Sequence, residues 1–154
     1  MATIKDKLKA FTPEQEYRIR SAVSVKENGK RYSIRLNEPS NSAVFQIDGD
    51  IIKIGQRCDK LILFETTKTS KWNEVFVELK GKDITHAIDQ IEASVNNEQF
   101  RHASIDKRYA RIVGKNIPRN TSSSVLTRAK IRFLKEYKCD LRAVNPGTSD
   151  NLQV

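Results

Sequence analysis

The chain has 154 residues, 38% hydrophobic and 31% charged, and its 28 Lys and Arg against 19 Asp and Glu give a formal net charge of +9. This length is enough for one domain with its own apolar core, and no run approaches the ~18 apolar residues of a membrane-spanning helix. The first residues lack the apolar stretch of a secretory signal. Cys58 and Cys139 are too few for a disulfide framework, so we expect reduced thiols in a cytoplasmic protein with no membrane partner.

The excess positive charge is concentrated in the last third of the chain. Residues 99–143 hold 12 Lys and Arg and three acids, whereas residues 1–98 have a net charge of +1. A basic segment within a structured region favours a polyanionic partner, with nucleic acid first among them. The alternative is a solvated basic face that only keeps the protein soluble.

The first third of the chain shows one helix signal and several strand signals. Thr12 before Pro13, with acids in the next turn, has the form of a helix start. Polar and apolar residues alternate after the turn at Asn28, which is typical of a strand. We therefore expect, in chain order, a helix from Thr12 to about Ala22, a strand over 31–36, a loop over 37–42, and a hairpin formed by 43–47 and 51–54.

The middle of the chain gives the clearest pattern. Ile84, Ile88, Ile91 and Val95 recur at helical spacing, and Asp83 precedes them as a helix N-cap. The apolar run after Cys58 is typical of a central strand. The expected elements are a strand over 58–64, a polar connection over 66–72, a strand over 74–80 and a helix over 84–95.

The last third predicts a strand over 108–113, a helix from Thr121 to about Glu136, a strand over 139–144, and a disordered tail from Pro146. Taken together, these elements predict a mixed α/β domain over residues 1–145, with a central mixed sheet flanked by helices and a disordered tail over 146–154.

Three charged residues of the two central strands are expected to converge. Strand side chains alternate between faces, so Glu78 and Lys80 point the same way, about 6.5–7 Å apart along the strand. If the two strands pair through the 66–72 connection, Asp59 lies beside Glu78. A buried face does not normally collect three such charges without a function.

Two carboxylates and a lysine in this arrangement suit phosphodiester hydrolysis. Mg²⁺ binds to one or two carboxylates and keeps several waters. A bound metal ion polarises a phosphate oxygen and lowers the pKa of a bound water. The lysine can orient that water or offset the charge that develops on the phosphorane.

Asp59, followed after eighteen residues by Glu78-Leu79-Lys80, resembles the D…ExK signature of the PD-(D/E)XK nucleases, which include restriction endonucleases and archaeal Holliday-junction resolvases. The resemblance covers about residues 44–144 and includes the helix directly after the ExK strand. It implies a restriction-endonuclease-like core.

The resemblance also implies roles for individual residues. Asp59 and Glu78 would bind Mg²⁺ or Mn²⁺, and Lys80 would be catalytic. Gln90 matches a glutamine that some members carry in the following helix. Glu16, with Glu14 second, would supply the acid of the N-terminal helix. Members of this superfamily often dimerise, so a homodimer is also implied.

The sequence thus predicts a metal-dependent nuclease that acts on DNA, or less favourably on RNA. Basic residues of the last third would contact the phosphates: Arg108, Arg111, Lys115, Arg119, Arg128, Lys130, Arg132 and Lys135. Two alternatives remain open. One is a catalytically silent nucleic-acid-binding module of the same fold, and the other is a basic interaction protein with an acidic protein partner.

Overall fold

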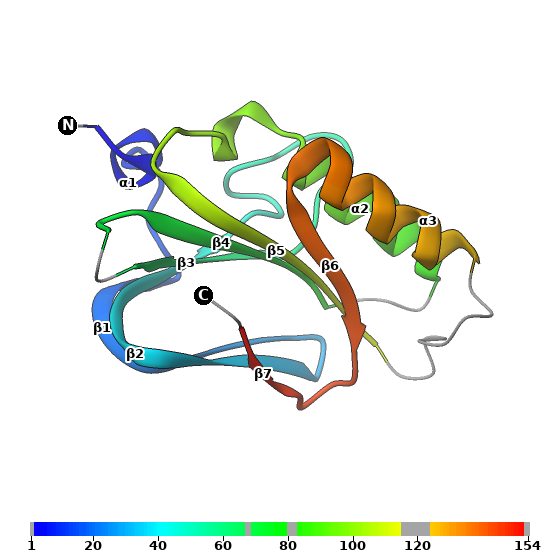
Figure 1. The fold of residues 1–154 in the computed structure, drawn as a ribbon, viewed down its shortest axis with the longest axis horizontal. Coiled ribbons are helices and arrows are strands. Elements are labelled where there is room, and N and C mark those ends of the chain that lie inside the picture. The colour runs from blue at the N-terminus through cyan, green and yellow to red at the C-terminus, as the bar shows by residue number, and fades with distance from the viewer. Residues whose placement is uncertain (1, 67–68, 80–82, 115–123, 153–154) are drawn as a thin grey trace.

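The structure is a computed structural model that describes residues 2–66, 69–79, 83–114 and 124–152. These residues form a mixed α/β protein with a seven-stranded mixed sheet and three helices (Figure 1). The strands are β1 (Gln15–Glu27), β2 (Lys30–Gln46), β3 (Lys60–Glu65), β4 (Trp72–Glu78), β5 (Ile105–Val113), β6 (Cys139–Val144) and β7 (Ser149–Asn151). The helices are α1 (Ile4–Lys7), α2 (Ile84–Val95) and α3 (Ser124–Arg132), together with a 3-10 turn at Glu98–Phe100 and a π-helical turn at Phe133–Tyr137.

The sheet has the order β1-β2-β3-β4-β5-β6, and β7 pairs with β2. Neighbours from β1 to β4 are antiparallel, whereas β4, β5 and β6 run parallel. Parallel neighbours need crossover connections, which α2 and α3 supply on the same side of the sheet (Figure 1). The predicted mixed sheet is confirmed, but the described helices cover one face instead of flanking both.

Two apolar cores lie on opposite faces of the sheet. The first contains buried residues of all three helices, among them Ile4, Ile91 and Leu126, packed against β3 to β6. The second lies on the other face, where the strongly curved strands β1 and β2 of the sheet enclose it (Figure 1). It includes Tyr32 and Leu152. The curled β1–β2 pair and the C-terminal segment thus take the place of a second helical layer.

The central elements agree with the sequence-based prediction. Strands β3 and β4 lie within two residues of the expected ranges, and every residue of β4 is buried. Helix α2 spans the predicted residues, and the Asp83 carboxylate accepts hydrogen bonds from the amides of Thr85 (3.0 Å) and His86 (3.3 Å). Strand β6 also has its predicted bounds. These elements carry strong local signals that agree with the tertiary packing.

The predicted helix from Thr12 to Ala22 is wrong, because these residues enter strand β1. Pairing with β2 begins directly after Pro13, where the Glu14 amide donates to the Val44 carbonyl (2.7 Å). Val23 and Val25 then alternate into the second core. Long-range pairing and burial therefore override the local helix-start signal.

The predicted loop over 37–42 and the hairpin over 43–54 are also wrong. Strand β2 continues through residue 46, and its register jumps between the pairs Arg20↔Ser40 and Ala22↔Arg35. The extra residues, with Pro39 among them, are accommodated as an irregularity of a long strand. After β2 the chain forms only a turn with a single bridge between Asp48 and Ile52.

The predicted disordered tail forms a strand instead. β7 pairs in parallel with β2 through Ser33↔Ser149 and Arg35↔Asn151, and Leu152 is buried in the second core. The polar composition of this segment gave no sign of the buried Leu152 or of Asp150, a half-buried ion-pair partner of Arg111.

Candidate functional site

The strongest site candidate is a pair of buried acids at one end of the β3–β4 pair. The register Lys60↔Val77, extended by one residue, places Asp59 opposite Glu78, and the Asp59 amide donates to the Val77 carbonyl (3.1 Å). Residues directly opposite each other in an antiparallel pair point to the same face. By strand alternation that is the face covered by α2, and each residue is only 2% exposed. We call Asp59 and Glu78 the acid pair.

A short hydrogen bond fixes the Asp59 carboxylate, and a longer contact reaches the Glu78 carboxylate. The Leu79 amide donates to Asp59 Oδ2 (2.7 Å), which orients that carboxylate along the end of β4. Gln90 Nε2 donates to Glu78 Oε2 (3.5 Å), and Gln90 Oε1 accepts from the Arg57 amide (3.5 Å). Of the four residues predicted to be catalytic, the structure therefore brings together Asp59, Glu78 and Gln90. Lys80 lies outside the described residues.

Two residues that the sequence reasoning missed position the chain just before the acid pair. The buried Ser94 hydroxyl accepts a hydrogen bond from the Cys58 amide (2.9 Å). Arg57 Nε forms an ion pair with Asp48 Oδ1 (2.7 Å). Ser94 follows Gln90 by four residues on α2, so the shared helix face was a signal that could have found it. The ion pair spans a turn without regular structure, and the sequence gives no signal for it.

The structure does not bring the predicted N-terminal acids to the acid pair. Glu16 is an exposed residue of β1, on the far side of β2 and β3. Glu14 Oε1 accepts from Lys60 Nζ (2.5 Å), and Lys60 alternates to the opposite sheet face from Asp59. Among the described residues, no three His, Cys, Asp or Glu side chains form a group that could hold a metal ion. The Glu16 assignment depended on the helix that the structure replaces with β1.

Two of the predicted phosphate contacts are structural ion-pair partners instead. Arg108 donates to Glu74 Oε1 (2.9 Å) and to the Val95 carbonyl (2.7 Å) beneath α2. Arg111 is 1% exposed and pairs with Asp150 (2.6 Å) and Asp140 (3.2 Å). Burial and fixed partners leave neither guanidinium available as an exposed phosphate contact.

The remaining predicted contacts divide into three groups. Arg128 and Lys135 are exposed on or just after α3, and Lys130 is half-buried. Arg132 forms two hydrogen bonds with the Glu92 carboxylate (2.8 and 2.9 Å). Hydrogen bonding from Arg132 holds the pKa of Glu92 below its usual value despite partial burial. Lys115 and Arg119 lie outside the described residues.

Two other buried groups near these elements have shifted pKa values. Burial raises the pKa of the Cys58 thiol beside Asp59, so this cysteine stays protonated and is no thiolate nucleophile. Burial also raises the pKa of Glu74 to about 7, and the attraction of Arg108 only partly opposes this. Both Cys58 and Cys139 are free and buried.

No family model, curated protein or solved structure matches this chain in the three comparisons. None of the described helices combines the length and apolar character that crossing a membrane requires. The site must therefore be interpreted from its own geometry.

Proposed function

We propose that this protein is a metal-dependent phosphodiester hydrolase of the PD-(D/E)XK type that acts on DNA. The observation that carries the proposal is the acid pair, because two like-charged residues face each other on a buried sheet face. Such an arrangement opposes stability. It is therefore better explained by a ligand that needs both carboxylates than by packing.

The order of the surrounding elements supports the proposal. The antiparallel strands β2, β3 and β4 are followed by α2, which crosses over to the parallel strand β5. This is the strand–hairpin–helix–strand order expected of a restriction-endonuclease-like core. It places Gln90 above the acid pair, where its amide contacts Glu78.

The donor atoms of the acid pair fit Mg²⁺ or Mn²⁺. Both ions favour oxygen ligands, and Mg²⁺ needs only one or two protein carboxylates beside waters and substrate phosphates. Bound there by Asp59 and Glu78, the ion would polarise a phosphate oxygen and acidify a coordinated water. A third acid, which the described residues do not place beside the acid pair, is not required for such a site.

Other residues of the chain would orient the two carboxylates, position the attacking water and bind the DNA backbone. The Leu79 amide fixes the direction of the Asp59 carboxylate, and the Gln90 amide restrains Glu78. Lys80 follows Glu78 by two residues in sequence. In the proposed role its ammonium orients the attacking water and offsets charge on the phosphorane. Exposed cations such as Arg128 and Lys135 hold the DNA backbone.

A second candidate function is a catalytically silent nucleic-acid-binding module. The lack of a third acid beside the acid pair among the described residues favours it. So do the two contacts of Gln90, because both lie at the outer limit of a hydrogen bond.

A cleavage assay separates the two. The purified protein is incubated with linear, nicked, branched and single-stranded DNA and with RNA, in Mg²⁺, Mn²⁺ or EDTA. We expect metal-dependent cleavage that falls about 100-fold or more in Glu78→Gln and in Lys80→Ala. Glu98→Gln, which changes an acid whose side chain is 85% exposed, is the matched control and keeps full activity. Salt-sensitive DNA binding without cleavage in any metal would establish the silent module instead.

A further inference from the structure

Two adjoining hollows lie at the β5–β6 edge of the sheet. Their volumes are about 360 and 190 Å³, and Asp106, Arg108 and Lys138 line both. We call them together the edge groove. Lys107 lines the larger hollow five residues before Ile112, which pairs with Glu78. Lys107 is thus about 17 Å along the strand from the level of Glu78. The side chains of Lys107, Tyr109 and Arg111 alternate to the face opposite the acid pair, so the groove is a separate site.

The edge groove is basic, and its cations differ in how they are held. Arg108 and Arg111 are fixed by Glu74 and by Asp140 and Asp150, as described above. The ammonium groups of Lys107 and Lys138, by contrast, form no hydrogen bond or ion pair within the described part of the chain. These two lysines are therefore available to an external anion.

Lys138 has an unusual backbone conformation for a lysine. It ends the π-helical turn in the left-handed region, with φ 51°, and its amide donates to the Leu134 carbonyl (3.2 Å). Glycine or asparagine normally occupies this position because a longer side chain is strained there. The side chain is exposed and does not pack in a core, so burial does not explain the choice of lysine, although its charge suits the C-terminal end of a helix.

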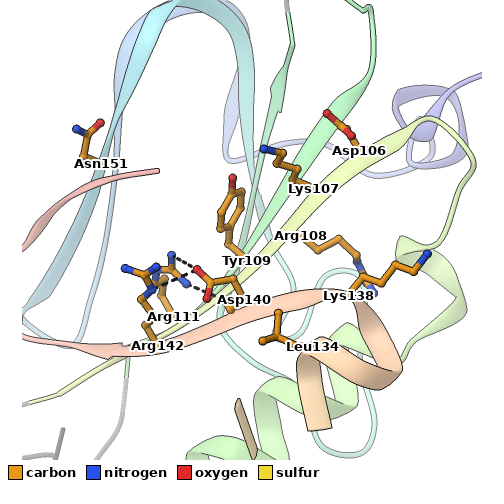
Figure 2. A pocket seen from close by; sticks show the side chains of 10 residues that line it. All are labelled: Asp106, Lys107, Arg108, Tyr109, Arg111, Leu134, Lys138, Asp140, Arg142 and Asn151. Atoms are coloured by element: carbon orange, nitrogen blue, oxygen red, sulfur yellow. Dashed lines mark hydrogen bonds and ion pairs between the residues drawn. The ribbon is translucent and has the colours of Figure 1, made fainter. Parts of the chain in front are cut away.

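The arrangement of the cations indicates the shape of the ligand. Figure 2 shows the Lys107 and Lys138 side chains well apart from each other on the same side of Tyr109, spread along the hollow instead of converging on one point. Arg142, whose side chain is 60% exposed, lies beyond Tyr109 with Asp140. A row of separated cations suits an anion with repeated charges more than a single small ion.

We propose that the edge groove binds the sugar–phosphate backbone of a nucleic-acid strand, with Lys107 and Lys138 contacting different phosphates. This inference rests on the proposed function for its choice of nucleic acid over an acidic polypeptide. The half-buried ring of Tyr137 in the lining favours the same choice, because it offers apolar surface to sugars and bases beside the charges.

The test is binding of a short fluorescent single-stranded DNA by the full chain in EDTA, at several salt concentrations. The variant Lys107→Gln/Lys138→Gly is compared with Lys26→Gln/Arg31→Gln, which removes two exposed charges from the β1–β2 hairpin. We expect about tenfold weaker binding in the groove variant. Its log–log salt slope should fall by about 1.4, because each lost phosphate contact contributes about 0.7 for a single strand. The control should change affinity less than about twofold.

Two outcomes overturn the inference. One is a salt slope in the groove variant equal to that of the control variant, with its Tm showing that it is folded. The other is competition by poly-glutamate as strong as that by unlabelled DNA, which would assign the groove to an acidic polypeptide. Asp59→Asn/Glu78→Gln separates the two proposals, because it should abolish cleavage and keep the wild-type salt slope. Metal-dependent cleavage by the wild-type protein, together with an unchanged salt slope in the groove variant, would contradict only the edge-groove proposal. A reduced salt slope in the groove variant, without cleavage by the wild-type protein, would contradict only the nuclease proposal.

Discussion

Two of the groups in which the described residues bury charge differ in their sign pattern. On the α2 side, the acid pair sets Asp59 against Glu78. On the other face, Arg111 contacts Asp150 (2.6 Å) and Asp140 (3.2 Å), and the Tyr32 hydroxyl donates to Asp150 Oδ2 (2.7 Å). We call this second group the C-terminal clamp. One group joins like charges and the other joins opposite charges.

This difference in sign pattern separates the acid pair, for which we propose a functional role, from the C-terminal clamp, which stabilises the fold. The C-terminal clamp ties β7 to the sheet, and its charges compensate one another where water is scarce. Removing one member leaves an uncompensated buried charge, which is strongly destabilising. The acid pair gains nothing comparable from its own members, because two close carboxylates repel. Buried opposite charges thus stabilise this fold, whereas we propose that the buried like charges of the acid pair serve a ligand.

The largest expected effect on stability comes from a substitution that breaks the C-terminal clamp. Asp150→Ala removes the shortest ion-pair contact of Arg111 and should lower the free energy of unfolding by about 3 kcal/mol. Urea unfolding monitored by circular dichroism measures it. Arg142→Gln, which changes an exposed neighbour of Asp140, should cost less than about 1 kcal/mol. If Asp150→Ala costs no more than this control, the clamp is not a structural element.

The second effect concerns Glu74, a buried carboxylate with one cationic partner. Its Oε2 makes no hydrogen bond within the described residues, and burial raises its pKa to about 7 despite Arg108. The folded protein then binds this proton more tightly than the unfolded chain does. Stability therefore falls as pH rises from about 5 to about 7, by roughly 2 kcal/mol. Glu74→Gln should flatten this profile in urea unfolding across that range.

A matched control is Glu98→Gln, because the Glu98 side chain is 85% exposed. It should keep the wild-type dependence on pH. A wild-type protein that gains stability between pH 5 and pH 7 would show that Arg108 outweighs burial at Glu74.

These buried charges also show what could be predicted from the sequence. The acid pair was predictable because its two strands are adjacent in the chain and have strong apolar runs. Alternation then fixes the face of each side chain. Gln90 was predictable only through the resemblance to the PD-(D/E)XK nucleases, whereas the Asp83 cap and the isoleucine stripe predicted the helix that carries it.

The C-terminal clamp was not predictable, because it unites residues 32, 111, 140 and 150, which only the full topology brings together. The sequence shows Arg111 as one cation among many in a basic segment. It shows Asp150 as part of a polar tail. The prediction of a helix in place of β1 was wrong for the same reason. Pairing of β1 with β2 outweighs the local helix signal, and sequence periodicity alone does not show which of the two is stronger.

A third prediction tests the acid pair through stability. Glu78→Gln keeps the shape of the side chain and removes one of two facing charges, so the free energy of unfolding should change by less than about 1 kcal/mol while cleavage is lost. Urea unfolding in EDTA gives the first result. A loss of more than about 1 kcal/mol would mean that Glu78 is structural, as Asp150 is expected to be.

The smallest expected effect extends the comparison from charge to backbone strain. Lys138 adopts φ 51° without burying its side chain, and in the proposed groove its ammonium contacts a phosphate despite this strain. Lys138→Gly should therefore raise stability by about 0.5–1 kcal/mol, seen as a higher Tm. Lys135→Gly, the same change three residues earlier within the π-helical turn, should lower stability by a similar amount because glycine is unfavourable inside a helix. If both variants are destabilised alike, the Lys138 side chain supports the fold, and its conformation no longer points to the edge groove.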